Sequence, residues 1–203
     1  MLDFIGPAEF AATTERKGVG THPHRGFETV TIVYEGGVSH KDSTGQGGTI
    51  GPGEVQWMTA GSGILHQEFH SDAFAKQGGI FQMVQLWVNL PAKHKMTLPT
   101  YQEILSQNIP EIQLSNSSGS IRVIAGEYEG QVGPAKTFTP MNVFDIRLKK
   151  GEELVLPAPN GWNASVVVLR GALESAGERG AVAQDAKMLI FSQDGQDIKV
   201  KAL

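Results

Sequence analysis

Two short runs in the first third of the chain carry residue types that bind metal ions. His22 and His24 stand two positions apart in residues 21–28 (THPHRGFE), and His66 stands two positions before Glu68 in residues 63–68 (GILHQE). Side chains along a strand alternate between its faces, so positions i and i+2 point to the same side. On a helix the same spacing separates two side chains by about 200°. Two neighbouring strands would therefore bring three imidazoles and one carboxylate to one point.

This donor set contains nitrogen and oxygen but no sulfur. By donor type it suits Fe(II), Mn, Co, Ni, Cu or Zn. Four protein ligands on an octahedral ion leave two positions open, which is enough for a bidentate substrate, or for one substrate oxygen together with O2. The sequence thus predicts one divalent metal ion held by His22, His24, His66 and Glu68.

Four further residues near these runs are candidates for the surroundings of the ion. Glu28 is the rival carboxylate ligand; otherwise it is expected to orient a histidine from behind. Arg25 could help to place an anionic substrate, and could equally be paired or solvated. Trp57 and Met58 are residue types that usually belong to the core, although some such side chains must line the cavity around an inward-facing ion.

The other histidines have simpler interpretations. His70 continues the same-face series of His66 and Glu68 but lies past the site. His40 and His94 stand among charged and turn residues, so we expect both at the surface.

Composition excludes several classes of function. A net charge of −4 and a pI near 5.9 argue against direct binding to nucleic acids or anionic membranes, which requires a basic face. Cysteine is absent, which rules out disulfides, thiolate metal sites and cysteine nucleophiles. The first residues (MLDFIGP) do not resemble a signal peptide, and no apolar run approaches the roughly 18 residues of a membrane span. We expect a soluble, cytoplasmic protein.

Short apolar runs separated by turn residues predict an all-β fold, since 25 glycines and 10 prolines punctuate the chain. Residues 79–90 are apolar on both faces and should be covered on both sides. Residues 1–20 are expected to be mostly loop, and residues 101–107 to form a helical turn. The expected strands are residues 29–34, 38–42, 49–50, 55–59, 64–70, 79–90, 121–125, 142–148, 153–156, 164–169, 187–191 and 197–201.

The chain also repeats itself at an offset of 135 residues. Residues 30–33 (VTIV) fall on residues 165–168 (SVVV), and Gly36 falls on Gly171. A duplicated β-domain explains this pattern. At the same offset residues 22–24 (HPH) become residues 157–159 (PAP), so a metal ion would belong to the first half only.

Several longer runs resemble the sequences of pirins: residues 22–29 (HPHRGFET), 52–61 (PGEVQWMTAG) with 63–68 (GILHQE), 85–91 (QLWVNLP) and 133–140 (GPAKTFTP). Pirins are bicupins, so the resemblance implies two β-sandwich or jelly-roll barrels packed in tandem. It implies a metal-binding domain over residues 1–118, a connecting segment over 119–135 and a metal-free cupin domain over 136–203. Both ends look short for the family, so the second domain looks truncated.

The resemblance also bears on the ligands. The pirin ligand motif falls on His22, His24, His66 and Glu68, with Fe(II) as the ion expected first. It favours Glu68 over Glu28, whereas the general cupin pattern H-x-H-x3-E would have favoured Glu28.

Several bacterial pirins resemble quercetin 2,3-dioxygenases, which open the heterocyclic ring of a flavonol with O2 and release carbon monoxide. For this chain the resemblance implies O2 and a flavonol or catechol-like small molecule as substrates, with Glu68 as the catalytic base for the flavonol 3-hydroxyl. The alternative is a non-catalytic, iron-dependent regulator that binds a protein partner and senses redox state. A third interpretation keeps the metal site for non-redox chemistry such as isomerisation.

Overall fold

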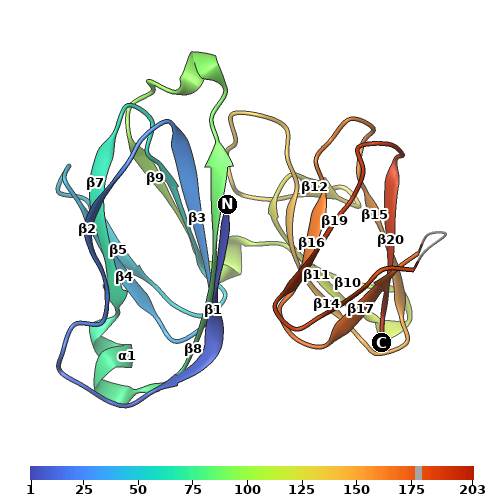
Figure 1. Cartoon of the computed structure of the whole chain (residues 1–203), viewed down its shortest axis with the longest axis horizontal. Coiled ribbons are helices and arrows are strands. Elements are labelled where there is room, and N and C mark those ends of the chain that lie inside the picture. The colour runs from blue at the N-terminus through green and yellow to red at the C-terminus, as the bar shows by residue number, and fades with distance from the viewer. Residues whose placement is uncertain (177–179) are drawn as a thin grey trace. The chain divides into compact units, whose positions relative to one another are not determined.

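The structure is a computed structural model that describes residues 1–176 and 180–203. The chain is nearly all β, as predicted from its sequence (Figure 1). It divides into two compact units, residues 1–110 with 123–143 and residues 111–122 with 144–203. The domain boundaries suggested by the sequence, at residues 118 and 135, stay a prediction.

Strands dominate the described residues, and the helical elements are short. No helix among them is long and apolar enough to cross a membrane. The helical elements are α1 (Asp72–Gln77) and the 3-10 turns η1 (Ala92–His94), η2 (Ser106–Asn108) and η3 (Ser115–Ser117). The strands are β1 (Leu2–Phe10), β2 (Gly18–His24), β3 (Phe27–Glu35), β4 (Val38–Asp42), β5 (Gly47–Ile50), β6 (Val55–Thr59), β7 (Ile64–His70), β8 (Gly79–Asn89), β9 (Thr100–Ile104), β10 (Glu111–Gln113), β11 (Gly119–Ala125), β12 (Glu127–Tyr128), β13 (Gln131–Val132), β14 (Val143–Leu148), β15 (Glu153–Pro157), β16 (Ser165–Val168), β17 (Ala172–Ser175), β18 (Val182–Gln184), β19 (Lys187–Ile190) and β20 (Asp197–Ala202).

Two antiparallel sheets form the first unit. One has the strand order β1-β8-β3-β6-β9 and the other the order β2-β7-β4-β5, and they appear as two layers in Figure 1. Hydrogen bonds join the inner faces, because Gln85 of β8 and Thr31 of β3 both reach Glu68 of β7. This is the sandwich predicted for a cupin, with β7 facing β3 and β8.

The two faces of the five-stranded sheet carry different residues. One face of β3 and β6 carries Val30, Ile32, Val55 and Trp57, which form an apolar cluster with side chains from residues 104–125. The other face, which looks toward β7, carries polar side chains such as Thr31. The period of two along each strand therefore separates an apolar core from a polar interior.

The second unit repeats the pairing pattern of the first. Its four-stranded sheet has the order β15-β20-β17-β18, which is the order β2-β7-β4-β5 moved along the chain by about 135 residues. Strand β16 pairs with β19 as β3 pairs with β6. The duplication inferred from the sequence is thus present in the sheet topology. Strands β10, β11 and β14 form a further sheet in the order β10-β11-β14.

The expectation that residues 1–20 are mostly loop is wrong. They contain β1, which pairs with β8 along the edge of the five-stranded sheet, and the first residues of β2. Strand β1 has an irregularity between Ile5 and Ala8, where Gly6 and Pro7 stand. Proline and glycine are tolerated at such an edge position, because a bulge there needs no complete ladder. Because these two residues usually mark a turn, the sequence pattern did not indicate the strand.

The expected helical turn over residues 101–107 is also wrong for most of its length. Residues 100–104 form β9, an edge strand that pairs with β6 and places Tyr101 opposite Met58. Only the short turn η2 follows it. The partner strand supplies hydrogen bonds that a local sequence pattern does not reveal, and this pairing decides the conformation.

We predict that Trp57→Ala lowers the free energy of unfolding by about 3 to 5 kcal/mol, because removing a fully buried indole leaves a cavity. Trp57 is 0% exposed and lies in the apolar cluster. Trp162→Ala is the matched control, since Trp162 is only partly buried and belongs to the second unit. Urea titration followed by circular dichroism measures both. Equal losses would contradict the assignment of Trp57 to the core.

Candidate metal centre

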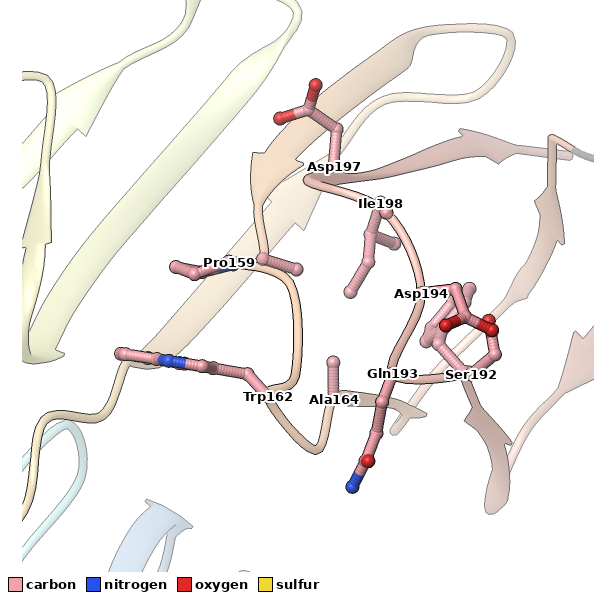
Figure 2. Close-up of a pocket in the computed structure, with 11 residues that line it drawn as sticks. Pro159, Trp162, Ala164, Ser192, Gln193, Asp194, Asp197 and Ile198 are labelled. Carbon is pink, nitrogen blue, oxygen red and sulfur yellow. The ribbon is translucent and has the colours of Figure 1, made fainter.

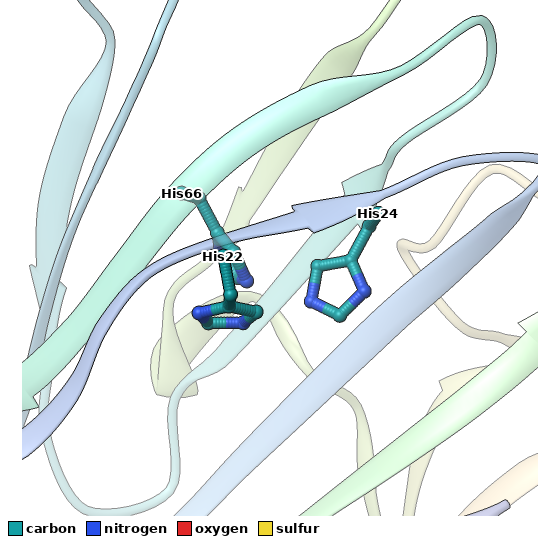
Figure 3. Close-up of side chains that lie close together, drawn as sticks. All are labelled: His22, His24 and His66. Atoms are coloured by element: carbon teal, nitrogen blue, oxygen red, sulfur yellow. The ribbon is translucent and has the colours of Figure 1, made fainter.

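Strands β2 and β7 bring the three predicted histidine ligands together. The strands pair antiparallel, with His22 directly opposite His66 and His24 opposite Ile64. An irregularity between Val19 and His22 precedes this stretch, so the register is set just before the first histidine. Figure 3 shows the three imidazoles on the same side of the two strands, pointing toward one another. The alternation predicted from the sequence places them there.

The distances within the cluster suit a shared ion. The ring centroids are 4.4 Å apart for His22 and His66, 4.7 Å for His24 and His66, and 4.8 Å for His22 and His24. One nitrogen from each ring lies within 4.8 Å of the others. Two nitrogen ligands of one ion are about 3 to 4 Å apart when each bond is about 2.1 Å long. The cluster is therefore nearly of the size that one ion requires.

A backbone hydrogen bond fixes the tautomer of His22. Its Nδ1 lies 2.8 Å from the carbonyl oxygen of Gly20. A carbonyl only accepts, so Nδ1 carries a proton, and in the neutral ring it is Nε2 that has the lone pair. Metal-binding histidines are commonly oriented in this way by a second hydrogen bond. The residue is thus prepared to donate Nε2 to a metal ion.

The other two imidazoles are buried without hydrogen-bond partners. Both ring nitrogens of His24 and both of His66 lack one, although His66 is only 1% exposed. Buried polar atoms normally have a partner, because leaving one unpaired costs about 1 to 3 kcal/mol. A metal ion would supply the missing interaction. On this observation the residues present fit a bound ion.

Burial also keeps these two rings neutral. Burial first, and then the charge of nearby imidazoles, lowers the pKa of His24 to about 4 and that of His66 to about 3. Both therefore hold a free lone pair at neutral pH, which is the form that binds a metal ion.

Glu68 adds a carboxylate beside the histidines. Its Oε2 lies 3.8 Å from Nε2 of His66, and the residue is 9% exposed. Both carboxylate oxygens accept hydrogen bonds of 3.1 Å from the amide of Gln85, and Thr31 is 3.5 Å from Oε1. Burial raises the pKa of Glu68, while these hydrogen bonds and the charge of His22 oppose the rise. Glu68 is the carboxylate that the fold places next to the cluster.

The rival carboxylate faces the other way. Glu28 belongs to the same face of β3 as Val30, and its Oε1 accepts a hydrogen bond of 2.7 Å from Thr59. Burial raises the pKa of Glu28. Trp57 lies on this apolar side as well, within the core cluster. Neither residue is brought to the histidines, so the idea that they surround the ion finds no support in the structure.

The roles expected for the two remaining candidates stay predictions. Met58 is fully buried and packs with Ala60 and Ile64. Arg25 is exposed, and its Nη2 lies 3.5 Å from the sulfur of Met96.

The structure corrects the placement expected for two other histidines. His40 is partly buried, and its ring lies 5.1 Å from that of Tyr101. His94 is partly buried against Phe138, at 5.0 Å. His70 lies outside the metal cluster, as expected, among the rings of several phenylalanines.

Sequence reasoning did not assign Trp87, Gln85 or Thr31 to the surroundings of the cluster, and it placed Phe27 among residues that usually belong to the core. Phe27 and Trp87 stack on each other at 4.4 Å, and both touch the ring of His24 edge-on. Gln85 and Thr31 contact Glu68. A signal for Gln85 was present, because it is a polar residue within the apolar run 79–90, but its partner could not be known before the sheets were placed.

The second unit has a pocket that includes Pro159, the residue at the offset position of His24. The pocket has a volume of about 170 Å³ and includes Pro159, Trp162, Asp194 and Asp197 (Figure 2). It contains no histidine among its lining residues. At the offset of 135 residues Lys201 and Leu203 take the places of His66 and Glu68. The second unit has therefore kept the strand order without the ligand set.

Comparisons with known proteins agree with this architecture. The family model described as Pirin matches residues 1–88, and the model of the pirin C-terminal cupin domain matches residues 143–203. A Pseudomonas aeruginosa protein named "Putative quercetin 2,3-dioxygenase" is 51% identical over 202 residues, which is 100% of this chain and 70% of that protein. Human pirin is 41% identical over 76% of this chain and 51% of its own length.

A solved structure shows the same fold. The crystal structure of a quercetin 2,3-dioxygenase from Acinetobacter baumannii has a TM-score of 0.95 and 51% identity, covering 99% of this chain and 69% of that one. The chain spans only 47% to 65% of the length of its plant and Caulobacter relatives. Two matching domain models and a relative that is half identical over the whole chain establish its descent: the chain belongs to the pirin family.

Proposed function

We propose that this pirin is a metal-dependent dioxygenase that cleaves a flavonol such as quercetin with O2 and releases carbon monoxide. In this proposal His22, His24, His66 and Glu68 hold one divalent metal ion, with Fe(II) expected first and Ni, Mn, Co, Cu or Zn as alternatives. The 51% identity to two proteins named as quercetin 2,3-dioxygenases, one of them "putative", supports the substrate class.

One observation carries the proposal: three imidazoles converge, and the two buried ones, His24 and His66, have no hydrogen-bond partner for either ring nitrogen. A further buried nitrogen without a partner, Nδ1 of His40, belongs to the β4 residue opposite Glu68. An interior of this kind is costly in an apo protein and suits a site occupied by an ion and a polar ligand.

The residues of the site would divide the work as follows. A bound ion would act as a Lewis acid that makes the flavonol 3-hydroxyl more acidic and would bring the substrate and O2 together. Glu68 would accept the proton of that hydroxyl, and its burial favours this role because a raised pKa makes a carboxylate a stronger base. The stacked pair of Phe27 and Trp87 offers an aromatic wall beside His24 for a planar ring.

The alternative is a non-catalytic regulator that uses the same ion to control a protein surface. Human pirin, at 41% identity, shows that the family extends beyond proteins named as dioxygenases. Turnover separates the two functions, because only the enzyme consumes flavonol.

We predict that the iron-loaded protein consumes quercetin aerobically and that His66→Ala abolishes both turnover and metal binding. Loss of flavonol absorbance, carbon monoxide release and metal content per chain measure this. His94→Ala is the control, because His94 packs against Phe138 and is not part of the cluster. Absence of turnover with iron, nickel, manganese and copper would contradict the dioxygenase function and favour the non-catalytic regulator.

Glu68→Gln and Glu28→Gln form a second matched pair, since both carboxylates are buried and differ in the face they occupy. We predict that Glu68→Gln lowers kcat by about 100-fold or more, the usual effect of losing a general base. Glu28→Gln should leave kcat within about threefold and act on stability only. The opposite ranking in steady-state assays would assign the carboxylate role to Glu28.

The lowered pKa values of His24 and His66 predict how the metal-free protein responds to acid. Between the ordinary histidine pKa of 6.5 and values of about 4 and about 3, the unfolded chain binds more protons than the folded chain. Stability is therefore fully present above pH 6.5 and falls as the pH drops through this window. Thermal unfolding from pH 8 to pH 4 measures the slope.

A double variant, His24→Gln with His66→Gln, is the control for this slope. It should flatten the loss of stability between pH 6.5 and pH 4. The raised pKa of Glu68 acts with the opposite sign, stabilising the folded chain at low pH, and is present in both proteins. Identical slopes would show that the two imidazoles are not held neutral by the fold.

A further inference from the structure

Gln85 contacts the proposed carboxylate ligand from the opposite sheet. It lies on β8, is 7% exposed, and its Nε2 is 3.1 Å from each oxygen of Glu68 and 3.1 Å from the hydroxyl oxygen of Thr31. One amide group thus spans both carboxylate oxygens. An ionised carboxylate only accepts hydrogen bonds, so the NH2 group of Gln85 must face it.

A second neighbour fixes the same amide from its other end. The indole Nε1 of Trp87 lies 3.4 Å from Oε1 of Gln85. An indole N–H only donates, so it requires the oxygen of the amide. Glu68 and Trp87 therefore demand the same orientation of Gln85, and a flipped amide would lose both interactions. A buried amide held at both ends is a rigid link.

Trp87 is itself one ring of the aromatic wall, so it joins the wall directly to the Gln85 amide. Its ring stacks on Phe27, with centroids 4.4 Å apart and planes at 22°, and meets the ring of His24 edge-on at 5.3 Å. Trp87 is also 36% exposed, whereas Gln85 and Glu68 are buried. The chain of contacts runs from a partly exposed indole through a buried amide to the carboxylate beside His66.

We propose that Gln85 is a positioning residue that fixes the Glu68 carboxylate for metal binding, and that Trp87 fixes Gln85 and so couples the aromatic wall to the metal centre. The inference rests on the proposed function, since it takes Glu68 as a ligand. It adds two residues, Gln85 and Trp87, that act through Glu68. Hydrogen-bond partners of metal ligands commonly change metal affinity by about 10- to 100-fold when they are removed.

Cobalt(II) is a suitable probe, because its visible absorption reports the ligands and geometry of the ion independently of turnover. Titration of the metal-free protein with cobalt(II) gives both the affinity and the spectrum. Gln85→Met keeps the length of the side chain and removes its hydrogen bonds. Trp87→Phe keeps a ring against Phe27 and removes one N–H donor. The double variant tests whether the second residue acts through the first.

We expect Gln85→Met to weaken cobalt(II) binding by about 10- to 100-fold and to change the visible spectrum. Trp87→Phe should shift the spectrum in the same direction and weaken binding about fivefold, as the loss of one hydrogen bond would. In the Gln85→Met background, Trp87→Phe should add less than about a twofold effect. Additive effects of the two changes would overturn the coupling.

Gln82→Met is the matched control. Gln82 is a buried glutamine of the same strand, 3% exposed, and stands at an odd spacing from Gln85, so it belongs to the opposite face of β8. The Gln82→Met protein should bind cobalt(II) with the same affinity and the same visible spectrum as the original protein. If Gln85→Met does not fold, Trp87→Phe still decides the matter, because an unchanged affinity and spectrum would overturn the inference.

The metal centre and the positioning role of Gln85 can be disproved separately. If the original protein binds no cobalt(II), the metal centre and the role of Gln85 fall together. If the original protein binds cobalt(II) and loses it in His66→Ala, while Gln85→Met and Trp87→Phe match the original, the metal centre stands and the positioning role is wrong.

Discussion

The pairing of β2 with β7 is the constraint on which the candidate site depends. It sets His22 opposite His66. His24 follows two residues after His22 on the same strand, so the three rings share one side of the sheet. A shift of one residue in this register would turn one strand's ligands to the outer face. The β7–β4 pairing holds the strand from its other side, with Asp42 opposite His66 and His40 opposite Glu68. The ligand strand is therefore fixed along both edges.

A polar interior within a sandwich needs an apolar core elsewhere. In the first unit this core lies on the far face of the five-stranded sheet, where Val30, Ile32 and Trp57 pack with Ile124. A second apolar cluster of Val33, Ile50, Phe74 and Phe81 closes one end of the sandwich. The interior side can then carry buried histidines and a carboxylate, whose desolvation is unfavourable until a ligand binds. The larger apolar core and the candidate metal site thus occupy opposite faces of the same strands.

The two units show how a duplicated fold separates architecture from chemistry. Strand order depends on apolar runs and turns, which both halves retain, and the sheets β2-β7-β4-β5 and β15-β20-β17-β18 correspond strand by strand. A metal site depends on a few side chains, and the second half has prolines and a lysine where the first has histidines. Losing those ligands leaves the backbone pairing intact, because strands are stabilised by ladder and packing interactions rather than by the ion.

The sequence by itself determined the all-β class, most of the strands and the histidine cluster, because alternation along a strand is a local property that follows from spacing. It did not reveal β1 or β9, whose edge pairing depends on partners distant in the chain. It could not choose between Glu28 and Glu68 from spacing alone; the tertiary structure turns Glu28 toward Thr59 and Glu68 toward Gln85. Only the packing of the two sheets decides which carboxylate lies beside the histidines. It also decides which glutamine and tryptophan contact that carboxylate and its neighbour. These contacts join residues that no local pattern in the sequence relates.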